Sequence, residues 1–173
     1  MKTIISLCLV SSSLFAVSQA KCYEIVKDEA RKYLIDGKRY QTTAAKIYDT
    51  ESDCRQTAIG DLNTNYMSMG AGQIRVPTVH FMAEKYPDIA AEVSGLSDFE
   101  IGKKLIKDIR FSVRITMHYL KYYMEAGYSY QDAVIMYNGF WEVDHKGRAI
   151  RDENGKRVKN VAYFNRVMRS DGR

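Results

Sequence analysis

The second half of the sequence contains a long row of apolar residues with helical spacing, and this row constrains the fold most. Its members recur every three or four residues: Leu105, Ile109, Val113, Met117, Leu120 and Met124. Such a stripe is typical of a helix that buries one face in a protein core. The 173 residues include only two prolines, so helices have few obligatory breaks. We therefore expect one mainly α-helical domain.

Capping residues and turn signals predict further helices along the chain. Ser97 and Glu100 have the spacing of a capping box, and Pro77 is suited to a first helical turn. Thr42 or Thr43 could cap a helix through its hydroxyl. Residues 60–72 are rich in Gly, Asn and Ser and predict an ordered loop. Besides the helix with the long stripe, we expect helices over residues 23–34, 43–53, 77–84, 89–93, 130–137 and 161–169.

Residues 142–159 form a strongly charged segment that allows two interpretations. Asn154-Gly155 lies between two short basic segments, 148–151 and 156–159. Asn-Gly between such segments is a strong signal for a β-hairpin, which would lie near residues 148–159. The alternative is a charged loop without regular structure, and the sequence alone does not choose between them.

The first twenty residues have the layout of a secretory signal peptide. Lys2 precedes an apolar region, and Ser18-Gln19-Ala20 forms a cleavage site of the small-x-small type. The alternative is a retained membrane anchor, but the apolar run is shorter than a span of about 20 residues requires. We expect residues 1–20 to be removed and residues 21–173 to form the domain.

Cleavage would leave two of the three cysteines, Cys22 and Cys54. In an exported protein such a pair predicts one disulfide, and the alternative is two buried free thiols. The three histidines show no ligand spacing, so we expect no metal site and no cofactor. The formal charge of +5 suits an acidic polymer or an anionic envelope, and it would also suit nucleic acid.

Glu51 is the acidic residue with the most unusual position. In a helix over residues 43–53 it shares a face with Ala44, Ile47 and Tyr48. Burial on such a face raises the pKa of a carboxyl group, and a carboxylic acid that stays protonated near neutral pH can protonate a glycosidic oxygen. The alternative is a partly buried Glu with a structural hydrogen bond or ion pair, and the helical periodicity by itself favours that alternative.

Four further segments follow Glu51-Ser52 in a characteristic order. They are Ser68-Met69-Gly70-Ala71-Gly72-Gln73-Ile74, Pro77-Thr78, Ala133-Val134-Ile135-Met136-Tyr137-Asn138-Gly139 and Asn160-Val161-Ala162-Tyr163-Phe164-Asn165-Arg166-Val167. Together they resemble the motifs of the soluble, goose-lysozyme-like lytic transglycosylases, particularly the small exported ones attached to secretion systems or phages. The chain departs from the pattern at Ala71-Gly72, at Arg75 and in the insertion over residues 142–159.

The resemblance implies a lysozyme-like helical fold and a peptidoglycan lytic transglycosylase that works without a cofactor. Glu51 would be the single catalytic acid and base. Ser68 and Gln73 would lie at the floor of the cleft and bind the sugar or Glu51. Tyr137 and Asn138 would orient Glu51 and contact an N-acetyl group, and Tyr163 would bring its hydroxyl to the same site.

The same resemblance implies partners and a location. The enzyme would act on peptidoglycan strands in the periplasm or cell envelope, in association with a secretion system or another envelope-spanning assembly. One alternative is a hydrolase of the same fold, a muramidase, with Asp61 as the nearest second carboxylate. Another is a non-catalytic glycan-binding component of a secretion machine. A nucleic-acid partner is not expected, because the one dense basic segment is the predicted hairpin.

Overall fold

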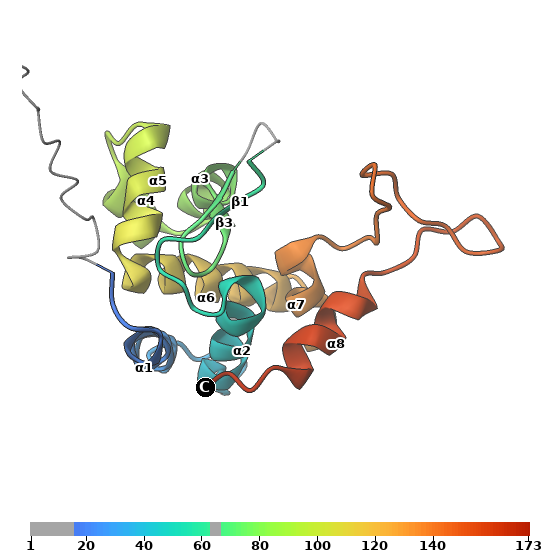
Figure 1. Ribbon diagram of the computed structural model, residues 1–173, viewed down its shortest axis with the longest axis horizontal. Helices are drawn as coiled ribbons and strands as arrows, with labels where there is room; N and C mark the ends of the chain where they lie inside the picture. The colour runs from blue at the N-terminus through green and yellow to red at the C-terminus, as the bar shows by residue number, and fades with distance from the viewer. Residues whose placement is uncertain (1–15, 63–66) are drawn as a thin grey trace, which may run out of the picture.

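The computed structural model describes residues 16–62 and 67–173, and this part of the chain is mainly α-helical (Figure 1). The sequence had predicted this class. A small antiparallel sheet, in the order β1-β2-β3, accompanies the helices. The elements are α1 Gln19–Ala30, α2 Gln41–Ser52, β1 Ile59–Gly60, β2 Ser68–Met69, β3 Ile74–Arg75, α3 Val76–Lys85, α4 Pro87–Val93, α5 Asp98–Lys107, α6 Ile109–Glu125, α7 Tyr130–Asn138 and α8 Val161–Arg169.

Helix α6 is the central element, and it packs against α1, α2, α3, α5 and α7. Figure 1 shows α1 and α2 on one side of α6, and α3, α4, α5 and the sheet on the other. Each side has its own buried apolar cluster. Val113 and Met117 of α6 belong to the first cluster, while Phe111 and Ile115 belong to the second. The helix is therefore buried on two faces.

The predicted apolar stripe belongs to two helices, not one. Leu105 is in α5 and packs in the second cluster, whereas Ile109 begins α6 and packs in the first. Asp108 separates the helices, because its backbone is extended and its carboxylate accepts a 2.9 Å hydrogen bond from the Phe111 N–H. An aspartate that caps a helix in this way favours a new start over a continuous helix.

The boundaries of several other helices agree with the prediction. Helix α8 spans the predicted residues 161–169, the Ser97–Glu100 capping box is formed, and Pro77 lies in the first turn of α3. The predicted loop over residues 60–72 contributes instead to the three-stranded sheet, in which Met69 pairs with both Ile59 and Ile74.

The expected hydroxyl cap of α2 is wrong. Tyr40 occupies the N-cap position, and no side chain caps the helix. Thr43 lies in the first turn and is buried, with its hydroxyl 2.8 Å from that of Tyr130. Its hydroxyl therefore joins α2 to α7.

The first helix covers residues 19–30, whereas the sequence predicted residues 23–34. Helix α1 begins at Gln19, with the Ser18 hydroxyl as its cap, and the Val17 N–H donates a 2.8 Å hydrogen bond to the Gln56 side chain. The predicted cleavage bond after Ala20 thus lies in the first turn of a helix. Residues 1–15 of the predicted signal peptide are outside the described residues, and its cleavage stays a prediction.

A disulfide joins Cys22 of α1 to Cys54, which follows α2, as the sequence had predicted. It closes a sequence separation of 32 residues. Within residues 16–62 and 67–173, no helix has both the length and the apolarity that a bilayer span requires.

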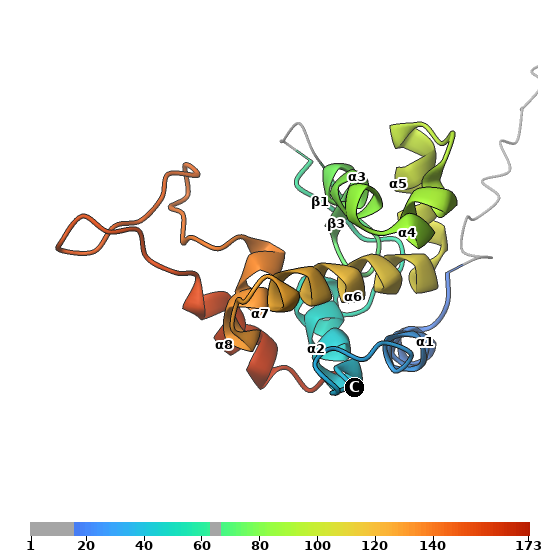
Figure 2. The ribbon, with the colours of Figure 1, turned by 180° about the vertical axis from the view of Figure 1, so that it is seen from behind.

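The charged segment forms a projecting arm, which we define as residues 140–160 (Figures 1 and 2). The arm pairs with itself through isolated antiparallel bridges, among them Arg151 with Arg157, without regular strands. Asp144 and Asp152 each accept backbone hydrogen bonds from residues two and four positions later, and these bonds form two tight turns. The turn at Asn154-Gly155 confirms the predicted reversal, while the segment is less regular than a full hairpin.

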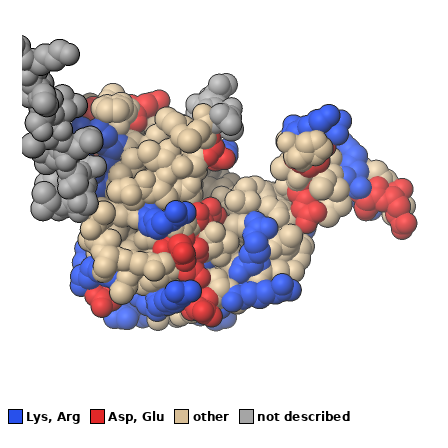
Figure 3. Space-filling model, viewed as in Figure 1, with Lys and Arg blue, Asp and Glu red and all other residues tan. Residues whose placement is uncertain are grey.

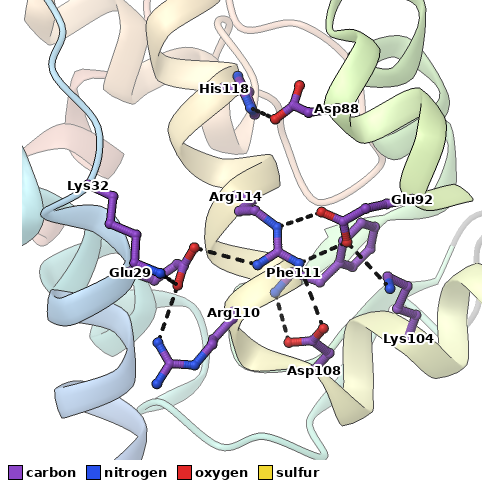
Figure 4. Close-up of polar contacts among 10 residues, drawn as sticks. All are labelled: Glu29, Lys32, Asp88, Glu92, Lys104, Asp108, Arg110, Phe111, Arg114 and His118. Carbon is purple, nitrogen blue, oxygen red and sulfur yellow. Dashed lines mark hydrogen bonds and ion pairs between the residues drawn. The ribbon is translucent and has the colours of Figure 1, made fainter.

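A network of charged side chains connects α1, α4 and α6 (Figure 4). Glu29 of α1 is almost fully buried and accepts hydrogen bonds from Lys32 and Arg110, at 2.7 and 3.2 Å. Arg114 lies 3.5 Å from Glu29 and also binds Glu92 of α4 at 2.7 Å. Burial alone would raise the pKa of Glu29, but these cations hold it below its usual value.

Candidate active site

A cleft with a volume of about 250 Å³ lies where α2, the small sheet, α6 and α7 meet. It contains five of the six residues that the sequence proposed for acid and substrate contacts, and the sixth, Tyr163, hydrogen-bonds to one of them. The cleft is lined by Glu51, Asp61, Ser68, Gln73, Ile74, Arg75, Thr78, Ile115, Tyr119, Met136, Tyr137, Asn138 and Gly139.

Glu51 lies at the C-terminal end of α2 and reaches the cleft from its partly buried position. Ala44, Ile47 and Tyr48 on the same helix are fully buried, so the predicted inward face is confirmed. The Tyr163 hydroxyl of α8 donates a 2.6 Å hydrogen bond to Glu51 Oε1. One carboxylate oxygen is thereby fixed, and the group has a defined orientation.

Burial raises the pKa of Glu51 to about 7. The hydrogen bond from Tyr163 and the charges of Arg166 and Arg75 oppose this rise, while the charge of Asp61 adds to it. A carboxyl group with this pKa is partly protonated at neutral pH, so it can donate a proton and afterwards accept one. Burial and the nearby Glu51 also raise the pKa of Tyr163, whose hydroxyl therefore stays a donor.

The end of α2 is fixed to the sheet region by the residue after Glu51. The Ser52 hydroxyl is buried and donates a 2.7 Å hydrogen bond to the Ala71 carbonyl. Asp53 and Cys54 then adopt left-handed backbone conformations, and the disulfide of Cys54 holds this turn against α1. The position of Glu51 is therefore held by two contacts of the residues that follow it, the Ser52 hydrogen bond to Ala71 and the disulfide of Cys54 to α1.

Ser68 and Gln73 form a pair on the sheet side of the cleft. The Ser68 hydroxyl donates to Gln73 Oε1 at 2.8 Å, and Gln73 Nε2 donates to the Gly70 carbonyl at 2.9 Å. Gln73 has a φ of 49°, which non-glycine residues adopt at a cost. These bonds fix the glutamine within its own loop and do not involve Glu51, so contact with a sugar stays a prediction.

Tyr137 has a different partner from the one we expected. Its hydroxyl donates to the Gly72 carbonyl at 2.7 Å and lies 3.1 Å from the Thr116 hydroxyl. It thus positions the loop that follows β2, whereas Tyr163 is the tyrosine that binds Glu51. Asn138 is exposed at the end of α7, and its side-chain oxygen accepts a 3.3 Å hydrogen bond from Asn160.

Two glycines of this loop, Gly70 and Gly72, lie close to other parts of the protein. A Cβ at Gly72 would lie 2.9 Å from the Tyr48 ring, and a Cβ at Gly70 would lie 2.3 Å from the Leu105 carbonyl. Both glycines therefore allow the loop to pack against the core of the protein itself.

Asp61 and Arg75 form an ion pair at the exposed side of the cleft. Arg75 Nη2 lies 2.9 Å from Asp61 Oδ2, and both side chains are substantially exposed. Asp49 and Asp53, which flank Glu51 in sequence, do not line the cleft; Asp49 accepts hydrogen bonds from Tyr23 and Ser170. In the described part of the chain, no three His, Cys, Asp or Glu side chains gather in a potential metal site.

Sequence reasoning missed the polar residues of α6 behind the cleft. Ser112 and Thr116 are fully buried, and their hydroxyls lie 2.7 and 3.3 Å from that of Tyr48. They connect Tyr48 to Tyr137 and so join α2, α6 and α7 beneath the loop. The signal was present, because two small hydroxyl residues four positions apart interrupt an otherwise apolar helix face.

Comparison with known proteins gives no relative: no family model, no curated protein and no solved structure matches this chain. The function is therefore inferred from the geometry of the cleft and from the motifs that converge on it.

Proposed function

We propose that this protein is a peptidoglycan lytic transglycosylase with a lysozyme-like helical fold, exported to the periplasm or cell envelope. Its substrate is the β-1,4 bond between N-acetylmuramic acid and N-acetylglucosamine. The observation that carries the proposal is Glu51, a carboxyl group with a pKa of about 7 that lines the cleft and accepts a hydrogen bond from Tyr163.

Glu51 performs both proton transfers in the proposed reaction. It first donates its proton to the bridging oxygen as the bond from that oxygen to the muramoyl anomeric carbon breaks. The muramoyl 6-hydroxyl then attacks this carbon and gives its proton to Glu51. The product is a 1,6-anhydro sugar, no water is consumed, and the acid is regenerated. A single carboxyl group is sufficient, in contrast to the usual pair in glycoside hydrolysis.

The arrangement of the other motif residues supports the same proposal. Two segments far apart in sequence line the cleft together with Glu51. One contributes Ser68 and Gln73, and the other contributes Tyr137 and Asn138. In its hydrogen-bonded pair with Ser68, Gln73 presents a fixed amide at the wall. Convergence of polar groups on one concave site is the usual property of a binding pocket.

Glu51→Gln tests the assignment, because it removes the transferable proton and retains the shape of the side chain. We expect the variant to fold and to lose the clearing of peptidoglycan in a zymogram. Glu84→Gln, which changes an exposed glutamate of α3, is the matched control and keeps full clearing. Clearing by the Glu51 variant at the wild-type level would favour a non-catalytic glycan-binding protein.

A hydrolase remains the second candidate because Asp61 lines the same cleft. A muramidase would use this second carboxylate to activate water. Asp61 forms an ion pair with Arg75, and its side chain is substantially exposed, so water can reach it. Asp61→Asn separates the two reactions: a hydrolase loses activity, whereas the transglycosylase retains most of it.

A further inference from the structure

The arm begins directly at the wall of the cleft. Asn138 and Gly139 line the cavity, and the next two residues are Phe140 and Trp141. The Asn160 N–H donates a 3.0 Å hydrogen bond to the Phe140 carbonyl and closes the base of the arm. From there the arm extends away from the helices (Figures 1 and 2). A polymer that leaves the cleft past the end of α7 therefore reaches these two aromatic residues first.

Three aromatic rings form a continuous row at this base, which we call the aromatic row: Tyr128, Phe140 and Trp141. The Phe140 ring lies 6.4 Å from that of Tyr128 and 4.7 Å from that of Trp141, both edge to face. Tyr128 is 41% exposed and Trp141 is 37% exposed. Neither belongs to the two apolar clusters. Rings that contact each other but remain open to solvent are typical of a binding surface.

Cations cover part of the aromatic row. Lys159 Nζ lies 5.2 Å from the centre of the Phe140 ring, and the Arg157 guanidinium lies 6.0 Å from that of Trp141. Lys159 is also held by Asp132 of α7 at 3.0 Å. Cations at these distances are attracted to the ring faces, so the rings and the positive charges lie together on one surface. Figure 3 shows further Lys and Arg side chains gathered along the arm.

The combination of ring faces and cations fits a glycan that carries acidic groups. The C–H face of a pyranose ring packs on an aromatic ring, and a carboxylate is attracted to a neighbouring Arg or Lys. Single-stranded nucleic acid would also stack on such rings. The arm contains four Asp and Glu against six Lys and Arg, however, and these acids weaken the field that a phosphate backbone needs.

We propose that the aromatic row is an additional sugar-binding site that extends the cleft along an acidic glycan strand. The inference rests on the proposed function, because the ligand is the same peptidoglycan polymer. Trp141 stacks on a sugar outside the cavity, and Arg157 binds a carboxylate of a peptide stem. The arm thus holds the strand while Glu51 acts on a bond inside the cleft.

Trp141 is the only tryptophan of the chain, so its fluorescence reports directly on this site. We would titrate the full chain carrying Glu51→Gln, which binds without cleavage, with soluble peptidoglycan strands that retain their peptide stems. The expected result is a saturable change in emission with the midpoint that calorimetry gives for the same strands. Calorimetric binding without a change in emission would overturn the proposal, as would the absence of any binding.

Substitution of Trp141 in the same Glu51→Gln background provides the second measurement. We expect Trp141→Ala to weaken strand binding about tenfold, the loss of one stacking contact, and Trp141→Phe to restore most of it. The control is Phe99→Ala, since Phe99 is 74% exposed with Lys103 5.4 Å from its ring, and lies on α5 away from the arm (Figures 1 and 2).

The outcomes separate this proposal from the proposed function. An affinity for strands that Trp141→Ala leaves unchanged would contradict the sugar-binding role of the aromatic row, whether or not the wild-type protein cleaves peptidoglycan. Binding that needs Trp141, together with a wild-type protein that cleaves nothing, supports the row and contradicts the enzyme. A single-stranded oligonucleotide that changes the emission when glycan strands do not would assign the site to nucleic acid.

Discussion

In the proposed reaction, Glu51 is a partly buried residue that must also ionise during each cycle. Its pKa of about 7 compares with an ordinary value of 4.5, and the main cause is burial. The same displacement that makes the group a proton donor at neutral pH disfavours the folded state when the group is charged. Catalysis and stability are therefore opposed at this one residue.

Glu51→Gln should for this reason stabilise the protein at alkaline pH. Above pH 7 the wild-type carboxyl is ionised in both states and is penalised only in the folded one, whereas near pH 4 it is protonated in both. We expect the variant to gain about 1–3 kcal/mol in the free energy of unfolding at pH 8 and almost nothing at pH 4. Urea unfolding at the two pH values measures this difference, and a variant less stable at pH 8 would contradict the burial argument.

Tyr163→Phe should move the pH dependence of the reaction. The Tyr163 hydroxyl stabilises the charged form of Glu51 and so lowers its pKa. Without it, the pKa of Glu51 rises and the alkaline decline of kcat shifts to higher pH, with a lower maximum rate because the carboxyl group is less well oriented. Tyr130→Phe, which removes a hydroxyl bonded to Thr43 outside the cleft, is the control. A pH profile unchanged by Tyr163→Phe would remove its proposed role.

Among the elements, the turn after α2 matters most to the site. Ser52 joins it to the loop of Ala71, and Cys54 joins it to α1. Asp53 and Cys54 have left-handed backbone conformations although neither is a glycine. Such conformations raise the free energy of the turn unless other contacts hold it. The disulfide and the serine hold the turn directly beside the acid, as a preorganised site needs.

Removal of the disulfide should lower stability and leave the identity of the cleavage product unchanged. By the chain-entropy model, a loop with a separation of 32 residues contributes about 3–4 kcal/mol. We expect reduction to lower Tm clearly while the cleavage product keeps its structure. The Cys22→Ser, Cys54→Ser variant should melt at the lower temperature with or without reductant. An equal Tm for the oxidised and reduced protein would contradict this contribution.

On the scale of the whole molecule, α6 and the Glu29 network join the two apolar clusters. Glu29→Ala removes the buried acceptor of Lys32, Arg110 and Arg114, and we expect a loss of about 1–3 kcal/mol at pH 7. The wild-type pKa of Glu29 is lowered, so this stabilisation is present above pH 4.5 and is lost as the pH falls below it. Glu24→Ala removes an exposed pair with Lys21 and should cost almost nothing. Equal unfolding midpoints for the two variants would contradict the network's importance.

The sequence predicted what depends on local patterns and missed what depends on distant contacts. Helix α8 and the Ser97 cap follow from spacing and hydrogen-bonding residues within a few positions. The break at Asp108 was missed because one capping residue outweighed a continuous apolar stripe. The partners of Tyr137 and Thr43 come from segments distant in sequence, a loop and another helix, and the periodicity of a single segment carries no information about them.

The candidate site was predictable in its members but not in their contacts. Motif order brought Glu51, Ser68, Gln73 and Asn138 into one proposed cleft, and the structure brings them to one cavity. The aromatic row and the hydroxyls of Ser112 and Thr116 were not anticipated. Each of these features depends on contacts that α6 and the arm make with other parts of the protein, and the sequence of either segment alone does not determine such contacts.

Analysis of the products by mass spectrometry tests the central claim most directly. Purified protein would be incubated with intact peptidoglycan, and the released fragments compared with those from Glu51→Gln. The account predicts fragments that end in 1,6-anhydro-N-acetylmuramic acid from the wild type and none from the variant. Fragments with reducing ends would show hydrolysis, and release of the anhydro product by the variant would show that Glu51 is not the acid.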